Sequence, residues 1–281
     1  GILGREITPR LLARHPDARV LAIVRGRNHG QVAERMDEVQ RYLRLYWPEV
    51  DLSRLFPLPG DVSRPFLGLE VEVYRRLTRC VTHIIHGAAS TKLGLPLECA
   101  REINVNGTAR LLSFAEQCLR LARYVHVSTA YVAGDRVGRI TEEDLDCSQG
   151  FRNGYEQSKF EAECLVRSRM NRVPVTVLRP SIVVGDSRDG HTSGFATLYY
   201  PLQRIRAGEV TRIPGDPDTP LDLVPVDHVA RTVERLLTDS AAIGGTYHVT
   251  AGEGNAVPVR RFIETAIWLA GDRPGRMPRF L

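Results

Sequence analysis

Short apolar runs rich in Val, Ile and Leu alternate with helical patterns along most of this chain, and this alternation limits the possible folds more than any other feature. Strands that alternate with helices are typical of a parallel sheet covered by helices on both faces. The run Val-Leu-Ala-Ile-Val at 20–24 is apolar on both sides, as expected of a strand buried between two helix layers. The sequence therefore predicts an α/β fold of the doubly wound Rossmann type. Strands are expected at Arg19–Val24, Leu55–Leu58, Val81–His86, Tyr124–Ser128, Val175–Leu178 and Thr246–Val249, and helices at 4–14, 31–46, 96–120, 154–171, 227–238 and 258–270.

Two glycines at the start of the chain resemble part of a phosphate-binding turn. Gly1 and Gly4, followed by Arg5, have the spacing of the last two glycines of a T-G-x-x-G-x-x-G turn, which follows a first strand and opens a helix. Glycines that simply let a turn pack would have the same spacing. The first strand and the first glycine of this pattern are missing from the sequence, so we expect a Rossmann domain truncated at its N-terminus.

The end of the first expected strand favours a phosphorylated dinucleotide. Folds that bind NAD place an acidic residue at this position on the ribose 2′-hydroxyl, whereas an Arg accommodates the 2′-phosphate of NADP. Here the strand runs into Arg25, no acid follows it, and Arg35 lies one turn into the next helix. We therefore expect NADP(H) as the cofactor, with solvated arginines as the alternative interpretation.

Small and polar residues follow the next two expected strands. Asp61 and Val62 come after the second strand, where a carboxylate can accept a hydrogen bond from the adenine amino group. Gly87, Ala88 and Ala89 come after the third, where small residues let a dinucleotide approach the backbone. Tight turns alone explain either segment. Because ligands of open α/β sheets bind at the carboxyl ends of the strands, their joint placement predicts the cofactor crevice.

A break in the periodicity divides the chain. The segment from Gly185 to Pro225 is rich in Pro and Gly and has no regular pattern, as insertions and loops do. We expect an NADP-binding Rossmann domain over residues 1–184. Residues 185–281 would combine a small substrate lobe with a last strand and helices that return to the core.

The residues with the clearest chemistry are Thr129, Tyr155 and Lys159. Tyr155 and Lys159 are four residues apart in an expected helix and so share one face of it. A phenol of ordinary pKa near 10 is a poor acid–base catalyst at neutral pH, and a neighbouring ammonium group is expected to lower that pKa. Thr129 ends the strand at 124–128, where its hydroxyl could hold a carbonyl oxygen. A Tyr-x-x-x-Lys pair by itself is common and often marks only an amphipathic helix face.

With these residues in place, the chain resembles the extended short-chain dehydrogenase/reductases over nearly its whole length. Within them it resembles the branch of fatty acyl-CoA reductases and carrier-protein thioester reductases, with their "male sterility"-type NAD-binding domain. The segments that carry the resemblance are Gly60-Asp61-Val62-Ser63-Arg64-Pro65, Ile103-Asn104-Val105-Asn106-Gly107-Thr108, Val127-Ser128-Thr129-Ala130-Tyr131-Val132 and Leu178-Arg179-Pro180-Ser181-Ile182-Val183.

The resemblance implies an oxidoreductase in which NADPH gives hydride to the carbonyl of an acyl-CoA or an acyl carrier protein. Thr129, Tyr155 and Lys159 would be catalytic and Asn104 would support them, while Pro180 and Ser181 would face the nicotinamide amide. Tyr155 and Lys159 would also contact the cofactor. Aldehyde and alcohol are both open as products, and so is the oligomeric state.

Two other functions stay open at this point. The Tyr-Lys pair and the Asn-Val-x-Gly-Thr pattern are shared by nucleotide-sugar epimerases and dehydratases and by hydroxysteroid-type dehydrogenases. A catalytically silent nucleotide-binding regulator would keep the fold as well, but it has no need of both Tyr155 and Lys159.

Other patterns carry little weight. His83 and His86 are three residues apart on an expected strand and so point to opposite faces, and Asp186 and Asp189 have no third ligand at a suitable spacing, so no metal site is expected. The sequon at Asn106 lies in an expected helix. The arginines between Arg260 and Arg279 are expected to be solvated, with docking of a carrier protein as the alternative.

The composition is that of a soluble protein in a reducing compartment. Five cysteines without a C-x-x-C pair suit neither a disulfide framework nor a zinc site. No apolar run reaches the ~20 residues that a membrane span requires, and no signal peptide is visible. The net charge of +5 is compatible with anionic partners such as coenzyme A. Since only Lys92 and Lys159 are lysines, the many arginines reflect composition rather than nucleic-acid binding. We expect a cytoplasmic location.

Overall fold

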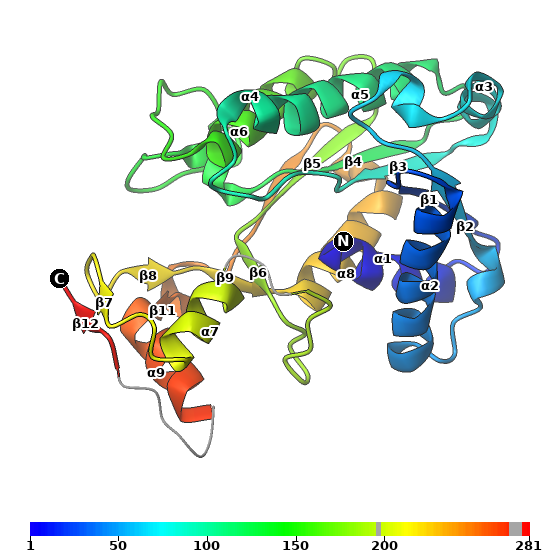
Figure 1. The fold of residues 1–281 in the computed structure, drawn as a ribbon. Helices are drawn as coiled ribbons and strands as arrows, with labels where there is room; N and C mark the ends of the chain where they lie inside the picture. Colours follow the sequence, from blue (N-terminus) through cyan, green and yellow to red (C-terminus); the bar gives the residue numbers. More distant parts are fainter. Residues whose placement is uncertain (195–197, 270–276) are drawn as a thin grey trace.

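The centre of the molecule is a parallel sheet with the strand order β10-β5-β4-β3 (Figure 1). The computed structural model describes residues 1–194, 198–269 and 277–281. Each neighbouring pair of strands in this sheet runs parallel, and the crossovers between them contain helices. The expected α/β fold with a parallel sheet is therefore confirmed. The four strands are β3 (His83–His86), β4 (Arg123–Val127), β5 (Val175–Pro180) and β10 (Thr246–Val249).

Two further strands, β1 (Val20–Val24) and β2 (Leu55–Pro59), form a separate parallel pair. The prediction that β1 is buried on both faces is wrong, because Leu21 and Ile23 are 38% and 37% exposed. Val20, Ala22 and Val24 pack into an apolar cluster formed with α1 (Ile2–Arg14) and α2 (His29–Tyr46), whereas Leu21 and Ile23 belong to none of the apolar clusters of the described residues. The helices thus cover one face of β1.

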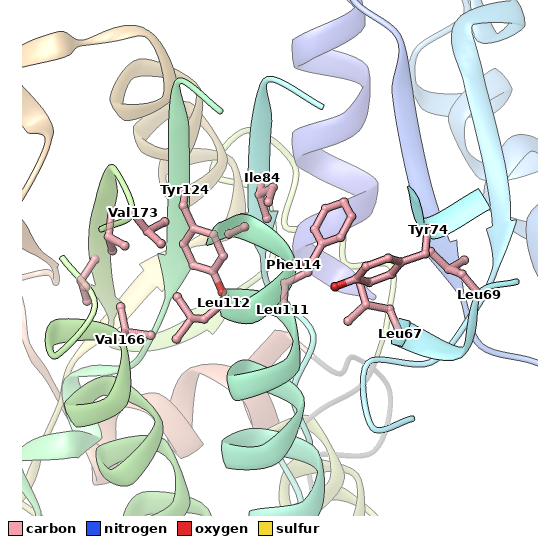
Figure 2. Packing of buried hydrophobic residues seen from close by; sticks show 13 residues of the cluster. Leu67, Leu69, Tyr74, Ile84, Leu111, Leu112, Phe114, Tyr124, Val166 and Val173 are labelled. Carbon is pink, nitrogen blue, oxygen red and sulfur yellow. The ribbon is translucent and has the colours of Figure 1, made fainter. Parts of the chain in front are cut away.

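The central strands are sandwiched between two helix layers. On one face, Ile84, Tyr124 and Val177 pack against helices α3 (Val71–Cys80), α5 (Gly107–Gln117) and α6 (Gly154–Arg167), and Figure 2 shows the Tyr124, Phe114 and Tyr74 rings in this layer. On the other face, Val125 and Leu178 pack against α1 and α8 (Val226–Thr238). Successive residues enter opposite clusters, so every residue of β4 and β5 is buried.

The long helix expected at 96–120 is interrupted. It consists of α4 (Leu97–Arg101), a π-helical segment at Glu102–Asn106, and α5. Such π segments are frequent at functional sites, and this one contains the buried Asn104.

Segments beyond β5 form a smaller lobe away from the central sheet (Figure 1). Its apolar cluster joins Ile205 of α7 (Tyr199–Arg206) to Ile263 and Ile267 of α9 (Val259–Leu269). Residue 270, included in the helix expected at 258–270, lies outside the described residues, as do Arg273 and Arg276 of the arginines between 260 and 279. The short strands beyond β5 are β6 (Ile182–Val184), β7 (Arg212–Ile213), β8 (Pro220–Leu221), β9 (Leu223–Pro225), β11 (Val257–Pro258) and β12 (Arg279–Phe280).

Short 3-10 turns occur at Leu52–Arg54 (η1), Pro65–Gly68 (η2), Ala130–Ala133 (η4), Ser240–Ala242 (η5) and Glu253–Asn255 (η6). Among the helices of residues 1–194, 198–269 and 277–281, none combines the length and the apolar character that crossing a bilayer requires. All five cysteines are free thiols.

Candidate active site at the carboxyl edge of the sheet

A capping interaction fixes the start of α6 and therefore the position of Tyr155. The Asn153 side chain accepts a hydrogen bond from the Glu156 N–H over 3.0 Å, and the Glu156 carboxylate accepts one from the Arg152 N–H over 3.0 Å. The Asn153 cap satisfies one of the amide groups that the first helical turn leaves free, and the bond to Arg152 holds the chain that leads into the helix. Gly154 leaves little space for a side chain, because a Cβ would lie 3.0 Å from the Leu95 carbonyl oxygen. Tyr155 thus sits in the first turn of α6.

Thr129 lies directly beyond β4 and faces this turn. Its hydroxyl accepts a hydrogen bond from the Tyr131 N–H over 3.3 Å and donates to the Pro180 carbonyl oxygen over 3.4 Å. Thr129 is buried, whereas Tyr155 is partly exposed. Hydrogen bonding with the Thr129 side chain lowers the pKa of the Tyr155 phenol, against a larger opposite effect of burial. The structure therefore brings Thr129, Tyr155 and Pro180 together.

Lys159 lies one helical turn after Tyr155 and is 3% exposed. Its ammonium group donates a hydrogen bond to the Val127 carbonyl oxygen over 2.8 Å. Burial lowers the pKa of Lys159 to about 8, and the nearby Glu163 carboxylate acts in the opposite direction. A buried amine of this kind can change its charge within the range of ordinary assays.

The expected acidification of Tyr155 by Lys159 is not found. Burial raises the pKa of Tyr155 above its ordinary value, Glu156 adds to that rise, and only Thr129 opposes it. The reason is that burial disfavours the phenolate, while Lys159 directs a hydrogen bond to the Val127 carbonyl. A phenol with a raised pKa keeps its proton at neutral pH.

Asn104 supports the site from behind. It is 1% exposed, and its side-chain oxygen accepts from the Ser90 N–H over 2.8 Å. Its amide nitrogen donates to the Ser90 carbonyl oxygen over 3.1 Å and to the Ser158 hydroxyl over 2.9 Å. Since Ser158 immediately precedes Lys159, Asn104 ties the loop after β3 to the middle of α6.

The residues expected to hold a dinucleotide follow the ends of parallel strands. Arg25 follows β1, and the Arg35 guanidinium donates to the Arg25 carbonyl oxygen, with both side chains exposed. Asp61 follows β2, but its Oδ1 atom already accepts from the Ser63 N–H and hydroxyl over 2.9 and 2.7 Å. Val62 is buried against Gly107.

Gly87, Ala88 and Ala89 follow β3 as expected. A Cβ at Gly87 would be 3.9 Å from its nearest neighbour, so packing does not require glycine there. Ser181 follows β5 and is 8% exposed, and its hydroxyl has no partner among the described residues. An unpaired buried hydroxyl at this edge is a candidate group for binding a polar ligand.

The start of α1 could hold a phosphate. Gly1 is its N-cap without a side-chain hydrogen bond, and its first turn contains no acidic residue. Gly1 and Gly4 are both exposed, with open space where a Cβ would lie. Free amide groups and the positive end of a helix dipole bind anions.

His83 and His86 lie on opposite faces of β3, as their spacing predicts. Burial lowers the pKa of His86 to about 3, and the ring contacts the Thr108 hydroxyl at 2.9 Å. Among the described residues no group of three His, Cys, Asp or Glu side chains could hold a metal ion.

The sequence analysis did not predict the buried ion pair of Glu163 and Arg179, which contacts Ser128 next to Thr129. Glu163 is fully buried, accepts a hydrogen bond from Ser128 over 2.6 Å, and forms an ion pair of 2.7 Å with the buried Arg179. A signal was present, because Glu163 lies four residues after Lys159 and therefore on the same helix face.

Comparisons with known proteins show the family of the chain. The NAD-binding family described as "Male sterility protein" matches residues 1–233. The chain is 27% identical over 263 residues to the fatty acyl-CoA reductase wat of Drosophila melanogaster, covering 79% of this chain and 50% of that protein. It is 30% identical over 267 residues to the large subunit of L-2-aminoadipate reductase of Penicillium chrysogenum, covering 89% of this chain and 19% of that protein.

A solved structure of a reductase (R) domain is also similar to the chain. The terminal R domain from the myxalamid PKS-NRPS biosynthetic pathway superimposes with a TM-score of 0.84 and 32% identity, covering 100% of this chain and 69% of that one. The matched part of the chain spans half or less of the length of each of the two curated relatives described above. Since the family match extends over most of the chain, the chain belongs to the "Male sterility protein" family of NAD-binding domains.

Proposed function

We propose that this chain is the reductase unit of an enzyme that reduces an acyl thioester, bound to coenzyme A or to a carrier protein, with NADPH. The observation that carries the proposal is the convergence of Thr129, Tyr155 and Lys159 at the carboxyl edge of the sheet. Relatives named as a fatty acyl-CoA reductase and an aminoadipate reductase support the substrate class.

Reduction of a carbonyl requires a protonated Tyr155, which is the form that the phenol has at neutral pH. When bound at this edge, NADPH would supply a hydride for the carbonyl carbon of the thioester. The protonated Tyr155 phenol would donate its proton to the carbonyl oxygen, and the Thr129 hydroxyl would hold the same oxygen. Donors placed where negative charge develops typically contribute several kcal/mol to the rate. Breaking the carbon–sulfur bond of the resulting hemithioacetal would release an aldehyde and a thiol.

The cofactor preference is part of the proposal. Arg25 and Arg35 are exposed at the end of β1 and would pair with the 2′-phosphate, with no acidic side chain there to select NAD. Gly1, Gly4 and the start of α1 would hold the pyrophosphate. Asp61, Val62, Gly87, Ala88 and Ala89 would line the adenosine side. Pro180 and Ser181 would face the nicotinamide, and Lys159 would hold the ribose hydroxyls.

The proposal also assigns the regions of the chain. Residues 1–184 would bind the cofactor, and the lobe within residues 185–281 would bind the acyl group. Free thiols and the absence of a membrane-spanning helix among the described residues agree with a location in the cytoplasm.

The test is to supply the protein with NADPH and an acyl-CoA or an acyl carrier protein, and to measure NADPH oxidation together with thiol release. We expect one thiol for each NADPH oxidised if the aldehyde is the product, and one for every two if the alcohol is. Oxidation of NADPH without thiol release, or turnover of a nucleotide sugar or hydroxysteroid with tightly held NAD, would contradict the proposal.

A further inference from the structure

Glu163 carries an extensively hydrogen-bonded carboxylate next to the candidate catalytic groups. The side chain is fully buried. Its carboxylate accepts hydrogen bonds from the Ser128 hydroxyl over 2.6 Å and from Arg179 Nη2 over 2.7 Å. Arg179 Nε and Arg167 Nε each donate to it over 3.1 Å. Three of these four donor atoms belong to arginine side chains, so the carboxylate lies in a site built for an anion.

Arg179 fixes the position of this carboxylate. It is fully buried in the last part of β5 and also donates to the carbonyl oxygens of Asp144 and Thr141, over 2.7 and 3.3 Å. A guanidinium held at several points by main-chain oxygens has little freedom to move. The Glu163 carboxylate is therefore held in one place by β5 and the loop after η4.

Two hydrogen bonds connect α6 to consecutive residues at the end of β4. Lys159 donates to the Val127 carbonyl, and Ser128 donates to the Glu163 carboxylate. The next residue is Thr129, whose hydroxyl faces Tyr155. Because Glu163 and Lys159 are one helical turn apart, the same carboxylate also faces the buried ammonium group.

We propose that Glu163 is a positioning residue for the proposed reduction, holding the Thr129 end of β4 against α6 and placing a negative charge beside Lys159. The assignment rests on the proposed function for its role in turnover. Its effect on the charge of Lys159 can be measured without any substrate.

Among the groups around Lys159, the Glu163 carboxylate is the one whose charge favours the protonated amine. Burial lowers the pKa of Lys159 to about 8, and Glu163 raises it. The other titratable groups nearby are Tyr155 on α6, His86 on β3 and His126 on β4. The pKa of each histidine is strongly lowered by burial, so both are neutral near pH 8 and do not compete with this effect. Removing the Glu163 charge should therefore lower the pKa of Lys159 further.

The chain contains only two lysines, Lys92 and Lys159, which makes a direct titration possible. Protein labelled with ¹³C-lysine gives two side-chain Cε signals by NMR, and Lys92→Arg assigns them. Glu163→Gln removes the charge while keeping the size of the side chain. Glu161→Gln is the matched control, since Glu161 lies on the same helix but pairs with the partly exposed Arg101.

We expect the pKa of Lys159 to fall by about one unit or more in Glu163→Gln and to stay at its parent value in Glu161→Gln. The pKa of Lys92 should not move in either variant. An unchanged Lys159 pKa in folded Glu163→Gln overturns the charge role. Because Glu163→Gln leaves Arg179 buried without its partner, Glu163→Gln with Arg179→Met is measured in parallel, and the same fall is required there.

Ser128→Ala tests the positioning role with every charge in place. We expect kcat to fall about 10-fold or more because Thr129 shifts, with the NADPH affinity and the pKa of Lys159 unchanged. Parent-like kcat would overturn this role. If no acyl thioester causes the parent protein to oxidise NADPH, the proposed function fails. The lysine titration still decides the link between Glu163 and Lys159.

Discussion

The Lys159 ammonium group donates a hydrogen bond to the carbonyl oxygen of Val127 over 2.8 Å. This contact joins α6 to the end of β4 two residues before Thr129, so it holds the helix that carries Tyr155 against the strand that leads to Thr129. Lys159 does so from a buried position, where burial lowers its pKa to about 8. Two predictions follow from this single group.

The first concerns the pH dependence of turnover. Protonated Lys159 is the form that can donate to ribose hydroxyls, and it loses its proton as the pH rises through about 8. We expect kcat/KM for thioester-dependent NADPH oxidation to fall on the alkaline side with a midpoint near that value. The measurement is a pH profile from 6 to 10, with Lys92→Arg as the control that keeps the same midpoint. A profile that stays flat to pH 10 would exclude Lys159 as the titrating group.

The second concerns stability. The pKa of Lys159 is lower in the folded protein than its ordinary value, so burying the ammonium group destabilises the folded state at neutral pH, and stability should rise between about pH 8 and pH 10. Lys159→Met should therefore raise the free energy of unfolding at pH 7 by about 1–3 kcal/mol, while activity is lost. Urea unfolding at pH 7 and pH 9.5 measures this, and the gain should shrink at the higher pH. Loss of stability at pH 7 would show that the hydrogen bond to Val127 outweighs the cost of the buried charge.

Asn104 provides a comparison between two positions of one π-helical segment. Asn104→Ala removes the partner of the Ser90 N–H and carbonyl and one of the two partners of the Ser158 hydroxyl, whereas Asn106 makes an exposed hydrogen bond to Glu102. We expect Asn104→Ala to destabilise the protein by about 2–4 kcal/mol and Asn106→Ala by less than about 1 kcal/mol. Thermal and urea unfolding give both values. Equal effects would mean that the Asn104 contacts do not stabilise the fold.

Arg25 tests the cofactor preference. Arg25→Asp places a negative charge where the 2′-phosphate is proposed to lie, so the KM for NADPH should rise about 10- to 100-fold and the ratio of NADH to NADPH use should increase. Arg79→Asp, an exposed change on α3, is the control and should leave both values unchanged. A parent-like preference for NADPH in Arg25→Asp would place the phosphate elsewhere.

Much of the fold and part of the site could be predicted because they depend on local spacing. The strands around Val125 and Val177 follow from apolar runs, and Tyr155 and Lys159 follow from a four-residue spacing on a helix. The start of α6 was also within reach, because Asn153 followed by Glu156 is a capping pattern.

The remaining features depend on which elements become neighbours in space. The pairing of Glu163 with Arg179 exists because β5 lies beside β4 under α6, and no spacing in the sequence reveals that order. The exposed face of β1 at Leu21 and Ile23 depends on where the helix layers end. The raised pKa of Tyr155 depends on burial, which the Tyr-Lys spacing alone does not give.

The most direct test of the account is NADPH oxidation with an acyl thioester by the parent protein and by Tyr155→Phe, which removes only the phenolic hydroxyl. With NADPH binding verified as equal in the two proteins, we predict that kcat falls about 10²- to 10⁴-fold in Tyr155→Phe, since the proton donor is lost. Equal kcat values in the two proteins would contradict the claim that Tyr155 donates the proton.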